Sequence, residues 1–288
     1  MKSSKSFLLE NKDLTLIKFL RNKSYQITET FIKSIKNKIK SEPKFKSAIQ
    51  RFPNQMKKSK EILNKFLKTE DFQQTIELSP ELFNSLDDSI QNIKFDTTCK
   101  IDFYLTDGNE FDGQYDQNQI DVILKMNLLT SILENKSINK SKQRLTYILA
   151  HELYHFYEEA QINKFTNELK DTTFELKRKI RKELRDKENV DFLKYILLTH
   201  EINAHYYEMI ITILDQRLNI NDLSYDTIIK FIHKIFFRNN KTAIKNVPER
   251  LMNKLVIKLY ADLEAIKKSN DKNLIVNQMN KKINQKRT

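Results

Sequence analysis

Two histidines four residues apart, with a glutamate between them, form the segment of this chain best suited to chemistry. His151, Glu152 and His155 lie in the stretch YILAHELYHFYEE, residues 147–159. On an α-helix, residues four apart share one face, so both imidazoles would point to a common position that suits a zinc ion. Glu152 lies about 100° round the helix from His151, where it would reach a water on the metal. The pattern predicts two metal ligands and one general base.

The residues around this segment favour a helix buried in a protein core. Apart from His151, Glu152 and His155, all residues from 148 to 157 are uncharged: Ile148, Leu149, Ala150, Leu153, Tyr154, Phe156 and Tyr157. A charge at these positions would argue against a buried metal helix, because burying an unpaired charge costs free energy. The alternative interpretation is a core helix whose two histidines are simply hydrogen-bonded.

A catalytic zinc ion needs a third protein ligand as well as one open position. The residues FYEEAQ after His155 contain neither glycine nor histidine, which excludes the pattern HExxHxxGxxH. The stretch LLTHEINAHYYEMI, residues 197–210, offers Glu201 and His205 on one helix face. Ala204 between them would let this helix approach another closely. Both Glu201 and His205 stay open as the third ligand.

Together the two segments resemble the gluzincin metallopeptidases, whose pattern is HExxH followed by a glutamate, often as ExxA, on a downstream helix. The matching residues are His151-Glu152-Leu153-Tyr154-His155 and Glu201-Ile202-Asn203-Ala204. The resemblance covers about residues 99–218, although the 45 residues between His155 and Glu201 exceed the gap in compact members. It implies a zinc-dependent peptidase with His151, His155 and Glu201 as ligands and Glu152 as general base.

Hydrolysis by such a site also needs a donor for the tetrahedral oxyanion. Candidates are Tyr157, His205, Tyr206 and Tyr207. His205 is preferred because it follows Glu201 by one helical turn, and Tyr207 is kept beside it as a second catalytic candidate. For each tyrosine taken singly, packing is the commoner role.

Composition predicts a mainly α fold of the α+β class. The chain of 288 residues contains two glycines and four prolines, so the main helix breakers are scarce. Helices are expected over Leu14–Lys40, Lys57–Lys68, Pro80–Ile93, Gln143–Ala160, Lys164–Lys187 and Phe192–Leu218. The resemblance implies a zincin-like core with a small β-hairpin or sheet before the HExxH helix.

The small sheet is expected from two alternating segments, Lys100–Thr106 and Gln119–Lys125. Between them lies DGNEFDGQYDQN, which contains both glycines, Gly108 and Gly113. Alternation on both sides of a glycine-bearing loop predicts a β-hairpin. A substrate peptide would then add as a further strand along Gln119–Lys125.

Charge divides the chain into three regions. Lys and Arg outnumber Asp and Glu by 19 to 12 in residues 1–98 and by 15 to 6 in residues 219–288, whereas residues 99–218 hold 17 against 20. We therefore expect a basic helical region at 1–98, a zincin-like metallopeptidase core at 99–218, and a basic helical region at 219–288. The net charge of +13 suits an acidic or nucleic-acid partner for the flanks.

Two other functions stay open beside a peptidase with a protein or peptide substrate. One is a basic nucleic-acid-associated protein with a structural or degenerate zinc site. The other is hydrolysis of a non-protein amide such as a peptidoglycan cross-link. The single cysteine, Cys99, indicates a reducing compartment, and neither a signal peptide nor a membrane span is expected. A cytoplasmic location follows, with phage-associated or non-classical export left open.

Overall fold

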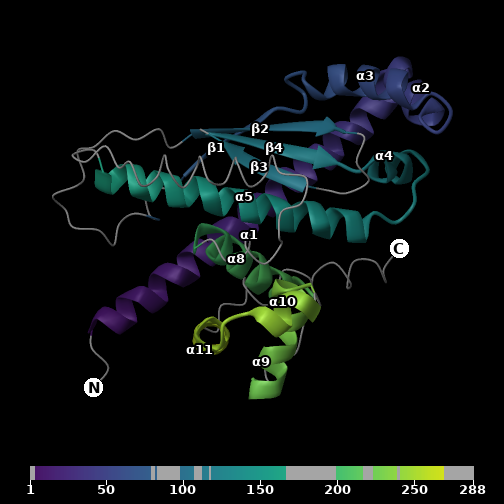
Figure 1. The fold of residues 1–288 in the computed structure, drawn as a ribbon. Helices are drawn as coiled ribbons and strands as arrows, with labels where there is room; N and C mark the ends of the chain where they lie inside the picture. Colours follow the sequence, from purple (N-terminus) through teal and green to yellow (C-terminus); the bar gives the residue numbers. More distant parts are fainter. Residues whose placement is uncertain are drawn as a thin grey trace, which may run out of the picture. The chain divides into compact units, whose positions relative to one another are not determined.

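The computed structural model describes residues 4–78, 82, 98–106, 112–116, 118–166, 199–216, 223–238 and 241–268 (Figure 1). Described residues are mostly helical and include one small mixed sheet, which confirms the mainly α (α+β) class. By residue contacts the chain divides into two compact units, residues 20–171 and residues 1–19 with 172–288. The three-region division of the sequence stays a prediction.

The unit of residues 20–171 contains a four-stranded sheet. Its strands are β1 (Gln74–Glu77), β2 (Thr98–Leu105), β3 (Asp112–Asp116) and β4 (Gln119–Leu124), in the spatial order β1-β2-β4-β3. β2 and β4 pair in parallel, whereas β1 pairs antiparallel with β2 and β3 antiparallel with β4.

The expected hairpin of Lys100–Thr106 with Gln119–Lys125 is therefore wrong. Those segments form β2 and β4, but they run parallel, and the hairpin partner of β4 is β3. The stretch between them is long enough for the crossover that parallel strands need, and it carries β3 within it. β4 is thus an internal strand, so the edge for an added peptide cannot be Gln119–Lys125; β1 and β3 are the edges.

One face of the sheet forms the core of this unit. Its inward residues are Ile76 of β1; Cys99, Ile101, Phe103 and Leu105 of β2; Gly113 and Tyr115 of β3; and Ile120, Val122 and Leu124 of β4. Phe103 stacks on Phe31 of α1 (Ser4–Ser41) with ring centroids 4.0 Å apart. The helix α5 (Asn139–Thr166) runs beneath the sheet and packs against β3 and β4 (Figure 1). The buried face therefore holds α5 in a fixed place below the edge strand β3.

Three shorter helices complete this unit: α2 (Pro43–Arg51), α3 (Met56–Leu67) and α4 (Met126–Leu133). Phe45 of α2 meets Phe66 of α3 edge to face, with centroids 5.4 Å apart. Asn64 of α3 makes two hydrogen bonds to the backbone of Leu105, at 2.9 and 2.7 Å. These bonds attach the helical pair to the end of β2.

The expected helices agree with the structure where they can be compared. Leu14–Lys40 lies within α1, Lys57–Lys68 corresponds to α3, and Gln143–Ala160 lies within α5. Pro80–Ile93 and nearly all of Lys164–Lys187 lie outside the described residues, except for Leu82 and the last residues of α5.

The second unit contributes α8 (Thr199–Asp215), α9 (Tyr225–Phe231), a π-helical turn η3 (Ile232–Phe236), α10 (Lys241–Asn246) and α11 (Glu249–Lys268). Phe192–Leu218 was expected as one helix, and its described part is α8. Within this unit α8 packs against η3, and α9 packs against α11. Among the described residues no helix is long and apolar enough to cross a membrane.

Candidate metal centre

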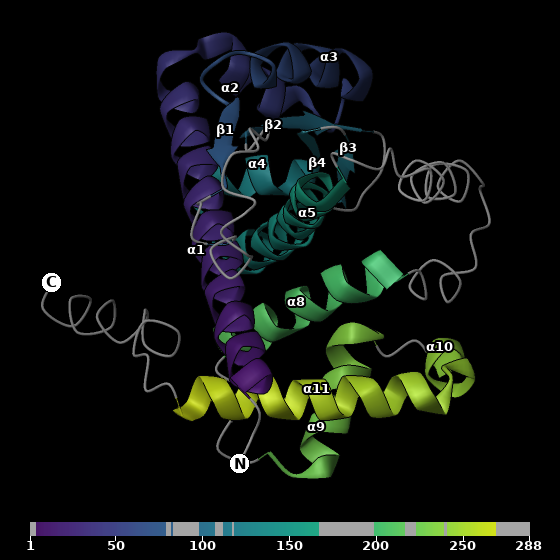
Figure 2. The same cartoon turned by 90° about the vertical axis from the view of Figure 1, so that its left-hand side faces the viewer.

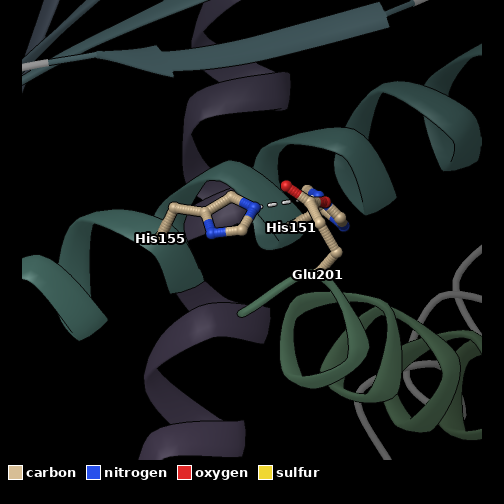
Figure 3. A group of neighbouring side chains, drawn as sticks. All are labelled: His151, His155 and Glu201. Atoms are coloured by element: carbon tan, nitrogen blue, oxygen red, sulfur yellow. Dashed lines mark hydrogen bonds between the residues drawn. The ribbon is translucent and has the colours of Figure 1, made fainter. Parts of the chain in front are cut away.

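The segment HELYH lies in the middle of α5 and is buried. Exposed fractions are 7% for His151, 3% for Glu152 and 3% for His155. The Nε2 atoms of the two histidines face each other at 3.1 Å (Figure 3). Two nitrogens bound at 2.0–2.1 Å to a tetrahedral zinc ion lie about 3.3 Å apart, so the pair already has the spacing that zinc requires.

Glu152 lies against the edge strand β3. A Cβ atom added to Gly113 would come within 2.7 Å of Glu152 Cγ, 2.9 Å of Glu152 Oε1 and 2.6 Å of Ile148 Cγ2. No side chain fits at that distance, so glycine allows the strand backbone to lie directly beside the carboxylate of Glu152. Sequence reasoning used Gly113 only as a sign of a turn.

Tyr115, two residues after Gly113, also faces α5. Burial raises the pKa of its hydroxyl, and the neighbouring carboxylate of Glu159 raises it further. The hydroxyl therefore keeps its proton beside Glu159; it donates to Asn118 Oδ1 at 3.4 Å and accepts a hydrogen bond from the backbone N–H of Asn118 at 3.2 Å. Glu159 lies one helical turn after His155, so β3 is fixed to α5 on both sides of the histidine pair. The sequence contained no sign of this contact.

The helix α8, in the other unit, carries a line of buried polar side chains. Its members recur at helical spacing along one face: Glu201, His205, Glu208, Thr212 and Asp215. Their exposed fractions run from 0% for Glu201 to 8% for His205 and Glu208. On an otherwise apolar helix such a line is unusual, because buried ionisable groups are costly unless paired or bound to a metal.

Within this line, His205 is held by Glu208. Its Nδ1 atom lies 3.1 Å from Glu208 Oε2, and Arg238 Nη2 lies 3.6 Å from Glu208 Oε1. Arg238 follows η3 and has φ of 51°, a left-handed conformation that is rare for a side chain of its size. The ring of Phe236 in η3 meets His205 edge to face at 6.1 Å. This arrangement directs the other ring nitrogen of His205, Nε2, away from Glu208.

The two tyrosines after His205 differ in their surroundings. The hydroxyl of Tyr206 donates to Asp262 Oδ2 of α11 at 2.5 Å, and Lys258 Nζ lies 3.1 Å from the same oxygen. Tyr207 is buried and packs edge to face on Tyr206, with centroids 5.7 Å apart. Tyr206 therefore has a structural role in joining α8 to α11, whereas the catalytic role of Tyr207 stays a prediction.

Buried histidine and glutamate side chains that could hold a metal ion are thus present in the described part of the chain. Figure 3 draws His151 and His155 on α5 together with Glu201 on α8. The assignment of Glu201 as third ligand stays a prediction, as does the competing assignment of His205. Neither a family model, nor a curated protein, nor a solved structure matches this chain.

Proposed function

We propose that this chain is a zinc-dependent metallopeptidase in which His151 and His155 bind the metal and Glu152 is the general base. The observation that carries the proposal is the buried pair of Nε2 atoms 3.1 Å apart, with Glu152 between them in sequence and beside the edge strand β3. A pair of histidines that only packed in a core would need neither this spacing nor the close approach of a strand to the intervening carboxylate.

Glu201 is the third ligand in this proposal. Both rivals for this role, Glu201 and His205, lie buried on one face of α8. Nδ1 of His205 is already held by Glu208 at 3.1 Å. Glu201 matches the glutamate of the pattern HExxH…ExxA and leaves His205 to that contact, so we assign the third ligand to Glu201.

Zinc bound there would polarise the scissile carbonyl and acidify the attacking water. Glu152 accepts the proton of that water and passes it to the leaving amine. Its burial suits this task, because water excluded from the site cannot weaken the electrostatic interactions that the reaction uses.

The substrate peptide binds along β3. β3 is an edge strand whose backbone lies next to Glu152 at Gly113, so a peptide paired with it would run past the general base. This proposal replaces the strand Gln119–Lys125, which is internal.

His205 donates a hydrogen bond to the oxyanion. Glu208 accepts from Nδ1–H of His205, which leaves Nε2 as the ring nitrogen that can serve the reaction. Arg238 Nη2, 3.6 Å from Glu208 Oε1, helps to keep Glu208 in place. Both residues thus act through His205 and are positioning residues.

The test is hydrolysis of unfolded protein and of a fluorogenic peptide library by wild type, Glu152→Gln and Glu158→Gln. Loss of a general base lowers turnover by about 10²–10⁴-fold, so Glu152→Gln should be nearly inactive while retaining its zinc. Glu158→Gln removes a neighbouring, partly exposed glutamate of the same helix and is the matched control. Full activity in Glu152→Gln, or zinc binding without hydrolysis in wild type, would refute the peptidase and favour a structural metal site.

A further inference from the structure

The positive charge of this chain is concentrated in one part of the structure. Residues 33–68, the end of α1 with α2 and α3, contain twelve lysines and arginines against two glutamates. Their net charge of +10 compares with +13 for the whole chain. Counts over residues 1–98 hide this concentration, because the remaining acidic residues of that region lie on either side of it.

Ten of the twelve cations are exposed: Lys33, Lys36, Lys40, Lys44, Lys46, Arg51, Lys57, Lys58, Lys65 and Lys68. These ten form the surface that we call the basic surface. Across the described residues, no ion pair neutralises any of them, whereas Lys38 pairs with Asp71 and Glu42. In Figure 2 the end of α1, α2 and α3 lie together at one end of the sheet, at the top of the view. The ten cations therefore lie on helices that are grouped together, and no ion pair among the described residues neutralises them.

The helix ends add to this positive potential. The first turns of α2 and α3 contain no acidic residue and carry Lys44 and Lys46, and Lys57 and Lys58; Glu42 is the N-cap residue of α2 and makes no side-chain hydrogen bond to the helix end. The first N–H groups of a helix have no partner within the helix and give that end a partial positive charge. Lysines at this end repel the helix dipole, and an external anion would relieve the repulsion.

The packing favours a nucleic acid over a membrane as the anion. The apolar faces of both helices point inward, with Phe45 and Ile49 of α2 and Leu63 of α3 fully buried. Four large apolar residues of the described chain are strongly exposed, and of these only Met56 belongs to residues 33–68. A helix that binds in a lipid interface instead exposes an apolar face.

The same packing favours a duplex over a single strand. Phe45 and Phe72 are buried, and Phe52 and Phe66 are half-buried, so none of the aromatic side chains in residues 33–72 is strongly exposed for stacking on bases. Single-strand binding depends on such stacking, whereas binding to a duplex backbone requires only cations and N–H groups at suitable spacing.

We propose that the basic surface of α1, α2 and α3 binds the phosphate backbone of double-stranded nucleic acid without sequence preference. This binding is independent of zinc and of hydrolysis. It brings the protein to a nucleic acid or to proteins bound there, and it assigns a role to the positive charge of the N-terminal flank.

The experiment measures binding of the full chain to a fluorescent 30-base-pair DNA duplex of mixed sequence over a range of salt concentrations. The test variant carries Lys44→Gln, Lys46→Gln, Lys57→Gln and Lys58→Gln. The control carries Lys234→Gln, Lys241→Gln, Lys245→Gln and Lys254→Gln, four exposed lysines outside the surface. Both variants lose the same net charge, so any difference in their affinity for the duplex is due to the positions of the replaced lysines. Circular dichroism checks that each variant is folded.

Wild type should bind with an affinity that falls steeply with salt. The test variant should bind at least tenfold more weakly, with the slope of log affinity against log salt reduced by about 3 to 4, since each lost phosphate contact contributes about 0.9. The control should lose much less. Equal loss in both variants would mean that only net charge matters, and would overturn the proposal.

Two further outcomes would also overturn it. If wild type bound phosphatidylserine vesicles but not the duplex, the surface would belong to a membrane. If it bound polyglutamate but not the duplex, the partner would be an acidic protein. The Glu152→Gln variant should bind the duplex as wild type does, so failure of the peptidase proposal and failure of this one are separate results.

Discussion

The helices α5 and α8 each carry buried histidines, but they use them differently. On α5 the histidines are four residues apart, and their Nε2 atoms face each other at 3.1 Å. On α8, Oε2 of Glu208 lies 3.1 Å from Nδ1 of His205, three residues earlier in the helix. Two imidazoles directed at one point suit a cation, whereas an imidazole held by a carboxylate suits proton donation. Spacing within one helix therefore separates the two kinds of histidine environment.

The surroundings of the two helices sharpen this difference. α5 lies beneath a sheet, and Gly113 brings a strand within contact distance of Glu152. α8 lies beside a π-helical turn and an arginine in a left-handed conformation, both of which are uncommon features that tend to occur at functional sites. The first helix is thus fixed by regular structure and the second by irregular structure.

The largest effect is expected on the α5 side, from Gly113→Ala. The new Cβ would overlap Ile148 and Glu152, so either the strand or the carboxylate must move. A displacement of about 1 Å can cost about 100-fold in rate, and overpacking costs about 1–3 kcal/mol in stability. Peptide hydrolysis and urea unfolding measure the two effects. The control Thr75→Ala, at an exposed position on the opposite edge strand, should change stability by less than about 0.5 kcal/mol. Unchanged activity in Gly113→Ala would show that the close approach of β3 to Glu152 does not matter for hydrolysis.

A smaller effect is expected on the α8 side, from Glu208→Ala. His205 would lose the acceptor for Nδ1–H, so turnover should fall about tenfold with little change in KM. This fall corresponds to about 1.4 kcal/mol of activation free energy. Nitrogen NMR of the histidine ring should show the Nδ1–H tautomer of His205 in wild type and a mixture in the variant. Glu208→Gln, which retains an oxygen acceptor, should restore part of the loss.

Thr212→Ala is the matched control on the same face of α8, where the hydroxyl bonds only to the Glu208 carbonyl. It should leave both turnover and the tautomer unchanged. A wild-type tautomer in Glu208→Ala would show that Glu208 does not position His205, and the comparison between the helices would fail.

The smallest effect is a pH dependence that reports the contact between β3 and α5. Burial and Glu159 raise the pKa of Tyr115 above its ordinary value near 10. In the unfolded chain Tyr115 ionises near pH 10, while in the folded chain it remains protonated. Its contribution to stability is therefore complete below pH 10 and is lost as pH rises further, at up to about 1.4 kcal/mol per pH unit.

Urea unfolding at pH 8 to 11 measures this loss in wild type and in Tyr115→Phe. Stability of wild type should decline more steeply above pH 10 than that of Tyr115→Phe, which has no proton to lose. Parallel declines in the two proteins would mean that Tyr115 is not buried against α5.

Local patterns correctly predicted the helices that can be compared, whereas pairing between distant segments could not be predicted from them. The HELYH helix and the helix of Glu201 and His205 follow from residue spacing alone. The parallel pairing of β2 with β4 does not, because β3 has the sequence DGQYD and only Gly113 and Tyr115 face inward. Alternation is too weak to detect in a strand whose buried residues are a glycine and one tyrosine.

The same reasoning applies to the surroundings of His205. Glu208 follows it by three residues on a predicted helix, so this contact was within reach of sequence reasoning. Arg238 was not, because its approach to Glu208 depends on the π-helical turn and on a positive φ that the sequence around residue 238 does not indicate.

The central claim is that the histidine pair of α5 binds zinc, and elemental analysis of purified protein tests it most directly. Wild type should contain about one zinc ion per chain, His155→Ala almost none, and Glu201→Ala much less than wild type. His233→Ala, which removes a partly exposed histidine of η3, should retain the full zinc content. If wild type contained no zinc or other divalent metal when purified or after addition of zinc, HELYH would be a core helix with two hydrogen-bonded histidines, and the account would be contradicted.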